Sequence, residues 1–333
     1  LGVWKLAPAL AAGNTIVVKP PLEAPFSTLR LAELAIEAGI PPGVVNVLTG
    51  GIPAATALVE SKDIAGVSIT GSSAAARSVG AHALSGLKHF SAEAGGKSAH
   101  IIFEDANLDD AVIAATQGAF SATGQTCVAG SRLFIHESLR DVFVERFLAS
   151  IQRLRQGDPL LKSTHVGPLA GARHEARVAG FIERAVDEGA RVLTGGNRPD
   201  LNETLRAGAW FAPTVIDNVR DDMEICREEV FGPVVTLSTF RNEEEAVERA
   251  NNVEYGLAAG FWTRDAGRIR RVAQSLQAGT VWVNTYRAIH WRVPFGGVKQ
   301  SGIGRENGPE GLNEFTQIKS VVHEYGPARN PFA

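Results

Sequence analysis

Short apolar runs rich in β-branched residues alternate with helical patterns over residues 1–95. This alternation is typical of a parallel, doubly wound α/β sheet. Turn residues mark the joints, since Gly39-Ile40-Pro41-Pro42-Gly43 ends one predicted helix and Thr49-Gly50-Gly51 follows a strand. The predicted strands are Thr15–Val18, Val44–Leu48, Ala65–Thr70 and Lys88–Ala92, and the predicted helices are Ser27–Ala38, Ala54–Glu60 and Ser73–Leu84.

The same kind of pattern restarts near Lys97 and predicts a second α/β domain. Its predicted strands are Ala99–Phe103, Arg132–His136, Phe211–Ile216, Pro233–Phe240, Leu257–Trp262 and Thr280–Asn284. Its predicted helices are Leu108–Ser121, Leu139–Leu154, His174–Glu188, Glu243–Asn251 and Ala266–Leu276. Between residues 157 and 205, connections containing Gly and Pro surround the helix that begins at His174.

These patterns divide the chain into residues 1–95, residues 96–306 and a C-terminal segment, residues 307–333. The last segment contains a strand-like run from Thr316 to His323. An exposed strand at a terminus needs the edge of another sheet as its partner. We therefore expect an oligomer of identical chains, a homodimer or homotetramer, in which this run is the oligomerisation strand.

Composition and charge restrict the classes of partner. The 333 residues are 44% hydrophobic and 21% charged, with a formal net charge of -3 and no basic cluster. Nucleic acid and anionic membranes are therefore not expected partners. The first residues lack the zones of a signal peptide, and two cysteines, Cys127 and Cys226, have no metal-ligand spacing. We expect a cytoplasmic protein without a metal site.

The amino terminus reads as a helix that is already under way. The chain opens on Leu1, and the helical pattern from Trp4 to Ala12 has no N-cap residue before it. The sequence therefore predicts a fragment of a longer protein.

Cys127 is the first candidate for chemistry. It lies in Gly124-Gln125-Thr126-Cys127 at the end of a predicted helix, with Ala129 and Gly130 after it. Open backbone N–H groups in such a loop lower the pKa of a thiol and bind a developing oxyanion. The alternative role is that of a small buried hydrophobic residue, which we assign to Cys226 because no glycine flanks it.

Glu93 is the second candidate. It follows the predicted strand Lys88–Ala92 and precedes Gly95-Gly96. A thiol that attacks a carbonyl needs a base to activate the water that clears the thioester, and this carboxylate suits that role. A strand-end carboxylate that caps local N–H groups is the alternative.

Three further segments have features of a dinucleotide site. In Thr70-Gly71-Ser72-Ser73 a strand turns into a helix whose first N–H groups can hold a pyrophosphate, although the motif is not GxGxxG. Lys19 ends a strand and can donate to a ribose or phosphate. Glu229 can accept hydrogen bonds from a ribose while Phe231 packs on a flat ring. The alternatives are a helix cap, a solvated strand end and a helix that leads into a strand.

Together these segments resemble the aldehyde dehydrogenase superfamily, in the family's order and over essentially the whole chain. Glu93-Ala94-Gly95-Gly96-Lys97 fits its glutamate motif, and Gly124-Gln125-Thr126-Cys127 fits its nucleophile motif. Two further segments, Glu229-Val230-Phe231-Gly232-Pro233-Val234 and Pro294-Phe295-Gly296-Gly297 through Gly304-Arg305-Glu306, match its nicotinamide-side and closing motifs. The resemblance implies an incomplete Rossmann-type dinucleotide-binding domain followed by an α/β catalytic domain.

The resemblance also implies the roles of individual residues. Cys127 is the nucleophile that forms a thiohemiacetal and then a thioester, and Glu93 is the general base for hydrolysis. Lys5 and Glu306 fall where family members place a proton-relay pair. NAD or NADP is then held by a set of five residues, namely Lys19, Gly71, Ser72, Glu229 and Phe231.

The sequence departs from the family pattern at several positions. The proline-tryptophan-asparagine segment that carries an oxyanion donor would precede Trp4, and this chain begins after it. Leu22 stands where an acid usually bonds the adenosine ribose, which leaves NADP open beside NAD. Ala76 and Ala122 replace a frequent glycine and a frequent asparagine.

The nature of the aldehyde stays open at this point. A group of residues before Pro294 can shape an entrance for an aromatic or carboxylate-bearing aldehyde, with packing of a surface loop as the alternative: Tyr286, Arg287, His290 and Trp291. Two other functions are weighed. A CoA-acylating semialdehyde dehydrogenase would pass the acyl group to CoA, and Glu93 argues against it. A catalytically inactive fragment or structural protein is the other.

Overall fold

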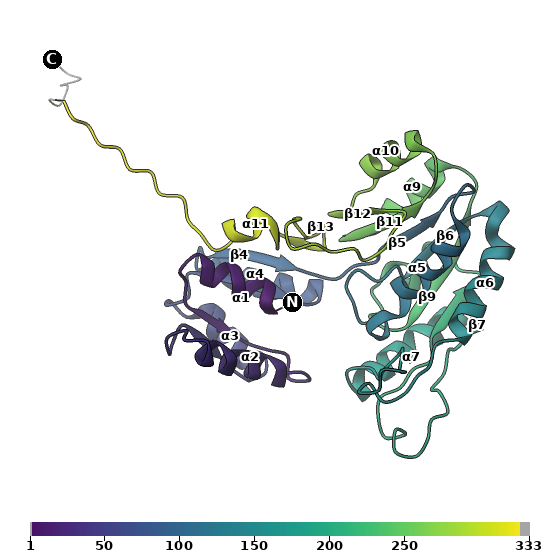
Figure 1. Cartoon of the computed structure of the whole chain (residues 1–333), viewed down its shortest axis with the longest axis horizontal. Coiled ribbons are helices and arrows are strands. Elements are labelled where there is room, and N and C mark those ends of the chain that lie inside the picture. Colours follow the sequence, from purple (N-terminus) through teal and green to yellow (C-terminus); the bar gives the residue numbers. More distant parts are fainter. Residues whose placement is uncertain (1, 327–333) are drawn as a thin grey trace.

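The computed structural model describes residues 2–326, which form a smaller and a larger lobe (Figure 1). The smaller lobe contains the amino-terminal elements, and the larger lobe contains most of the chain after residue 98. The predicted α/β architecture is confirmed. No helix in the described range is both long and apolar enough to cross a membrane.

The smaller lobe follows the predicted alternation of strand and helix, with boundaries that differ by a few residues. Its elements are α1 (Gly2–Ala11), β1 (Ile16–Val18), α2 (Phe26–Glu37), β2 (Val45–Val47), α3 (Ile52–Glu60), β3 (Gly66–Thr70), α4 (Ser73–Ser85) and β4 (His89–Glu93). Helix α4 begins where the sequence indicates, because the Ser72 hydroxyl accepts a hydrogen bond from the Ala75 N–H at 3.2 Å.

The strands of this lobe belong to two separate sheets. Strand β1 pairs with β2 in parallel, and β3 pairs with β4 in parallel. In residues 2–326 no ladder of hydrogen bonds joins the two sheets, so β1 and β3 each keep one unpaired edge. The two pairs of strands therefore do not form one continuous sheet within the described residues.

The larger lobe is built on a seven-stranded sheet in the order β12-β11-β5-β6-β9-β8-β7. Its strands are β5 (Ala99–Ile102), β6 (Arg132–His136), β7 (Arg191–Thr194), β8 (Thr214–Asp217), β9 (Val234–Phe240), β11 (Ala258–Trp262) and β12 (Thr280–Val283). Its helices are α5 (Leu108–Phe120), α6 (Arg140–Gln152), α7 (Ala172–Asp187), α8 (Glu224–Arg227), α9 (Glu243–Asn251) and α10 (Ala266–Ser275). Only β7, which the sequence analysis missed, runs antiparallel to its neighbour.

Helices cover both faces of this sheet, so its central strands are buried on both sides. On one face, α5 and α6 place Phe120, Phe143 and Phe147 against the strands. On the other face, α9 and α10 pack on Phe103 and Phe261. The sheet is thereby a rigid platform for the loops at its two ends.

The chain returns from the larger lobe to the smaller one near its C-terminus. Strand β13 (Val298–Lys299) pairs with β10 (Tyr255–Gly256), and β14 (Gly302–Ile303) pairs with β4 of the smaller lobe. Ser301 lies between them and is fully buried. Its hydroxyl donates to the Gly95 carbonyl at 2.7 Å and accepts from the Gly256 N–H at 2.9 Å. This single side chain connects three segments.

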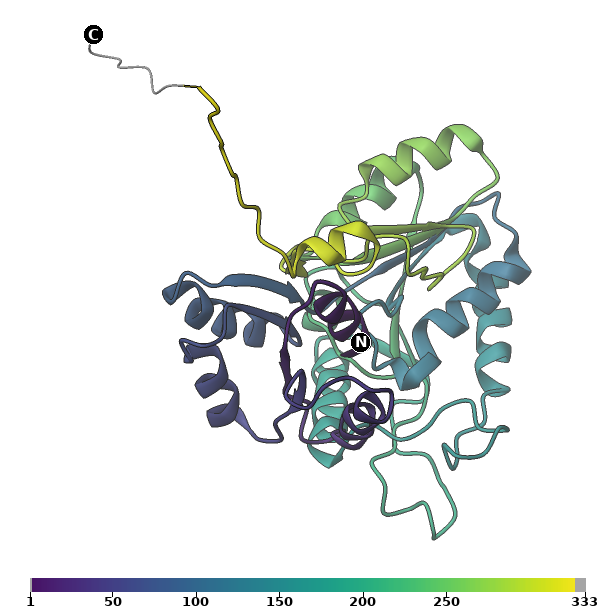
Figure 2. The same cartoon turned by 60° about the vertical axis from the view of Figure 1, so that its left-hand side comes forward.

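After helix α11 (Gly308–Asn313), the described chain extends away from the body of the molecule (Figures 1 and 2). The run from Thr316 to His323 forms no strand pairing within residues 2–326. Its apolar side chains face solvent, with Ile318, Val321 and Val322 all more than four-fifths exposed. The expected oligomerisation strand is therefore extended and has no strand partner among the described residues.

Candidate functional site

The loop that presents Cys127 is conformationally strained. Helix α5 ends at Phe120, and Ala122, Thr123 and Gly124 then follow with φ values of 53°, 58° and 66°. The left-handed region costs a non-glycine residue about 1–2 kcal/mol. A Cβ on Gly124 would lie 2.0 Å from the Gly232 carbonyl oxygen, so this loop lies directly against the loop that follows Phe231. Tertiary packing holds the strained turn and sets the position of Cys127.

Two glycines after Glu93 bring the Cys127 loop and Glu229 to one place. A Cβ on Gly96 would lie 2.1 Å from the Cys127 carbonyl oxygen, and a Cβ on Gly95 would lie 2.7 Å from Glu229 Oε2. The Gly96 N–H donates to Glu229 Oε1 at 3.0 Å. Only residues without side chains permit this approach.

Burial raises the pKa of the Cys127 thiol to about 11, and the negative charges of Glu229 and Glu93 act in the same direction. The backbone N–H groups of Cys127 and Val128 lower this pKa, as the sequence analysis expected, but their effect is the smaller one. The expectation of a net lowering is therefore wrong. Burial and nearby acids depend on the folded chain and leave no mark in the local motif.

Glu93 is the last residue of β4 and is 5% exposed. Burial raises the pKa of its carboxyl group to about 8, and the charge of Glu306 adds to the rise, whereas Lys5 and Arg305 oppose it. Its Oε2 atom has no hydrogen-bond partner in the described part of the chain. In its deprotonated form, a carboxylate with this pKa is basic enough to take a proton from water.

Lys5 and Glu306 form an ion pair between α1 and the C-terminal return of the chain. The Lys5 ammonium also donates to the Ser68 hydroxyl on β3 at 3.0 Å. The pair lies near Glu93, because both charges act on the pKa of that carboxyl group. The structure thus brings together four of the predicted residues: Cys127, Glu93, Lys5 and Glu306.

The candidate dinucleotide residues of the smaller lobe lie at the carboxyl ends of parallel strands. Lys19 follows β1, and its ammonium donates to the carbonyls of Pro20 and Gly50 at 2.8 and 2.9 Å. Gly71 follows β3, and its N–H donates to the Glu93 carbonyl at 3.0 Å. Ser72 caps α4, so the helix begins beside the strand that ends in Glu93.

The Glu229–Phe231 segment is held from α7. Arg177 donates to the carbonyls of Glu229 and Val230, and the His174 ring nitrogen bonds to the Phe231 carbonyl at 2.7 Å. Phe231 has a φ of 57° and is 38% exposed, which leaves its ring available for packing. The sequence analysis missed both supporting residues because they lie on a separate helix, more than fifty positions away in the chain.

Arg132 was also missed and has a structural role. It is buried and donates to the carbonyls of Lys97, Arg249 and Ala250. Lys97, which follows the glutamate motif, is buried as well, and this burial lowers the pKa of its ammonium to about 8. Both charged side chains are thus buried in the larger lobe.

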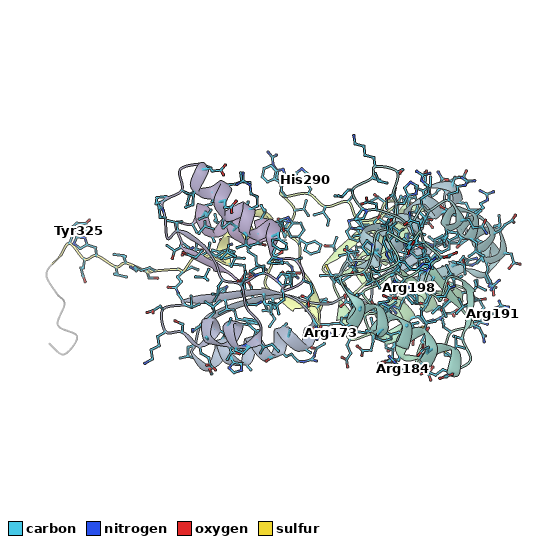
Figure 3. All side chains as sticks on the ribbon, turned by 90° about the horizontal axis from the view of Figure 1, so that it is seen from below. Arg173, Arg184, Arg191, Arg198, His290 and Tyr325 are labelled. Atoms are coloured by element: carbon cyan, nitrogen blue, oxygen red, sulfur yellow. The ribbon has the colours of Figure 1, made fainter. Side chains whose placement is uncertain are left out.

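A cavity of about 550 Å³ in the larger lobe is separate from Cys127. It lies at the carboxyl ends of β6, β8 and β9, whereas Cys127 precedes β6, and Figure 3 shows Arg191 of this cavity on the outer side of the larger lobe. Arg140 and Arg191 both donate to Asp217 at 2.7 Å, so these guanidinium charges are paired with an acid. Among the described residues, no cluster of His, Cys, Asp or Glu could hold a metal ion.

The family model, the related sequences and the solved structures that match this chain are all aldehyde dehydrogenases. The model of the "Aldehyde dehydrogenase family" matches residues 1–321. A betaine aldehyde dehydrogenase of Brucella anthropi is 44% identical over 332 residues, which cover 100% of this chain and 68% of the relative. A betaine aldehyde dehydrogenase of Agrobacterium fabrum is 42% identical, with 100% and 67% covered.

Solved structures agree with the sequence matches. An NAD-dependent aldehyde dehydrogenase from Sinorhizobium meliloti superposes with a TM-score of 0.96 at 37% identity, covering 100% of this chain and 65% of that one. A betaine aldehyde dehydrogenase from Staphylococcus aureus in complex with NAD+ also gives 0.96 at 37% identity, covering 99% and 66%. The chain therefore spans about two thirds of the length of its relatives.

The raised pKa of Cys127 predicts how its thiol reacts. Alkylation by iodoacetamide, followed by mass spectrometry of the Cys127 peptide, should accelerate about tenfold per pH unit between pH 7 and 10. Glu93→Gln removes a charge that raises this pKa, so alkylation above pH 8 should become several-fold faster. Cys226→Ala is the control, because Cys226 is buried and should leave the profile unchanged. A Cys127 rate that is already constant from pH 7 upward would contradict the prediction.

Proposed function

This chain belongs to the aldehyde dehydrogenase family, and from that premise we propose that the intact protein oxidises an aldehyde to a carboxylic acid with NAD or NADP. The observation that supports the proposal is that Gly96, three residues after Glu93, packs against the Cys127 carbonyl, and that the charge of Glu93 acts on the Cys127 thiol. A nucleophile and a base in one buried site are what thioester formation and hydrolysis require.

The chemistry of the chain's own residues follows in two stages. The Cys127 thiolate adds to the aldehyde carbonyl carbon, and loss of hydride from the resulting thiohemiacetal leaves a thioester on the sulfur. Glu93 then takes a proton from water, whose oxygen attacks the thioester carbon, and the carbon–sulfur bond breaks to release a carboxylic acid and the Cys127 thiolate, while Glu93 passes its proton to solvent. The N–H groups of Cys127 and Val128, which act on the sulfur, are placed to stabilise charge in this loop.

A nicotinamide dinucleotide supplies the hydride acceptor when bound, and the residues present fit such a group. The first N–H groups of α4 have no partner within the helix, and a Cβ on Gly71 before them would have no atom closer than 3.7 Å. We propose that Lys19, Gly71 and Ser72 bind the phosphate and ribose groups. Glu229 and the exposed ring of Phe231 then orient the nicotinamide end.

Removing the base should separate the two stages. With Glu93→Gln, one equivalent of reduced cofactor per active chain should form rapidly, after which turnover should be about 10²–10⁴-fold slower than in the wild type. Stopped-flow absorbance and mass spectrometry of acylated Cys127 measure both. Glu228→Gln is the matched control, because the Glu228 carboxylate accepts a hydrogen bond only from the Tyr255 hydroxyl among the described residues, and this variant should keep normal turnover.

The same experiment tests the alternatives. Because Glu93 must be deprotonated, hydrolysis should fall about tenfold per unit as the pH decreases below about 8. Release of an acyl-CoA in place of the acid would favour a CoA-acylating enzyme. Full turnover by Cys127→Ala would contradict the assignment, and a wild-type protein without any burst would favour the inactive or structural interpretation.

Leu22 bears on the choice between NAD and NADP. It follows Lys19 by three positions, is 62% exposed and lies 3.9 Å from the Cβ position of Gly51. We propose that its neutral side chain admits the 2′-phosphate of NADP, since a carboxylate at this position would repel it. Both cofactors are then substrates of the intact protein.

Leu22→Glu should therefore lower the ratio of kcat/KM for NADP to kcat/KM for NAD by at least about tenfold, through charge repulsion. Steady-state kinetics with each cofactor measure this ratio. Leu22→Gln, which has the same shape without the charge, should lower it much less. Equal ratios for the two variants would exclude an electrostatic role for this position.

We also propose that the protein is a cytoplasmic homo-oligomer, assembled through the extended run from Thr316 to His323. Its exposed apolar side chains and unpaired backbone support this assembly, and two free cysteines are typical of a reducing compartment. The double variant Val321→Asp and Val322→Asp should lower the molar mass measured by light scattering. Lys319→Glu on the same segment should retain it. An unchanged molar mass in the double variant would contradict the proposed assembly. Recovery of the protein from a periplasmic fraction would contradict the cytoplasmic location.

A further inference from the structure

Tyr286, which follows β12, is fixed in a slot that three glycines form. A Cβ on Gly118, Gly130 or Gly260 would lie within 2.9, 3.0 or 2.5 Å of its ring. The ring also stacks on His100, with the centroids 4.4 Å apart. Since any side chain at these glycines would displace the ring, the slot determines where the following residues begin.

Hydrogen bonds of the residues on either side fix the position of the next residue, Arg287. The Tyr286 hydroxyl donates to the Val128 carbonyl at 3.1 Å, and Val128 directly follows Cys127. The Trp282 indole N–H donates to the Ala288 carbonyl at 2.8 Å. Arg287 between them has a φ of 60°, a conformation that only surrounding contacts maintain in a non-glycine residue. Arg287 is therefore held between two anchored residues, the first of which, Tyr286, contacts the Cys127 loop.

The guanidinium of Arg287 has no acidic partner in residues 2–326. Its Nη1 atom is buried and has no hydrogen-bond partner there, and no ion pair to Arg287 forms in that range. Burying a charged N–H group without an acceptor costs free energy. This atom is therefore free to donate a hydrogen bond to a ligand. Its positive charge also opposes the burial that raises the pKa of Tyr286, so the guanidinium lies near the phenol.

A second arginine on the same loop, Arg292, differs from Arg287 because its guanidinium lies over an aromatic ring. The Arg292 guanidinium lies 4.6 Å from the centroid of the exposed Trp291 ring. His290 on this loop lies between the two lobes (Figure 3).

Of the acids near Cys127, Glu93 is mostly uncharged at neutral pH and Glu229 accepts from the Gly96 N–H. Neither of them pairs with Arg287.

We propose that Arg287 binds a carboxylate on the substrate, so that the aldehyde oxidised at Cys127 carries an anionic group at its other end. A planar guanidinium matches a carboxylate through two parallel hydrogen bonds. The same charge disfavours an aldehyde with a quaternary ammonium group, such as betaine aldehyde, for which the relatives are named. This inference rests on the proposed function and specifies its substrate class.

The test compares substrates of equal length in the intact protein. We expect a higher kcat/KM for 4-oxobutanoate than for butanal or betaine aldehyde. Arg287→Gln should lower the ratio of 4-oxobutanoate to butanal by about tenfold to a hundredfold, through a rise in the KM of the anionic aldehyde. Arg287→Lys should keep part of the preference. Arg292→Gln, which makes the same charge change five positions on, should keep all of it.

A binding measurement on the wild-type protein makes the test independent of folding in the variants. Succinate should slow the alkylation of Cys127 by iodoacetamide, whereas choline at the same concentration and ionic strength should not. Equal protection by both, or a wild-type preference for butanal or betaine aldehyde, would overturn the role of Arg287 and leave aldehyde oxidation standing. Absence of oxidation with all three aldehydes would instead refute the proposed function.

Discussion

Contacts between backbone atoms at glycine positions hold the candidate site together. Gly96 lies against the Cys127 carbonyl, and Gly124 lies against the Gly232 carbonyl. These contacts join segments that are separated by long stretches of chain, so a single added methyl group would push the Cys127 loop away from its neighbours. The site residues depend on these contacts for their positions, and the strained turn at Ala122 and Thr123 persists because the same packing holds it.

The charges of the site form a coupled set. Glu306 raises the pKa of Glu93, and Glu93 in turn raises the pKa of Cys127. A proton gained by one acid therefore makes the next group easier to ionise. Because Lys5 pairs with Glu306, the amino-terminal helix takes part in this balance although it lies far from Cys127 in sequence. Protonation of any one of these groups changes the behaviour of the others.

Local patterns predicted much of the fold, because strands such as β5, β6 and β9 are largely buried and carry mainly apolar residues. Strand β7 was missed because it is short and lies at the sheet edge, so its side chains need not be apolar. Motifs also identified Cys127 and Glu93 as candidate site residues. They did not predict the bridging role of Ser301 or the upward shift of the Cys127 pKa, since both arise from residues that only the folded chain brings near.

The two separate sheets of the smaller lobe have a consequence for ligand affinity. Lys19 follows a strand of one sheet, and Ser72 follows a strand of the other. A dinucleotide that contacts both residues must also fix one sheet relative to the other. Part of the binding free energy then offsets the rigid-body freedom that the two sheets lose. A strand that joined their two free edges would therefore tighten cofactor binding without contacting the cofactor.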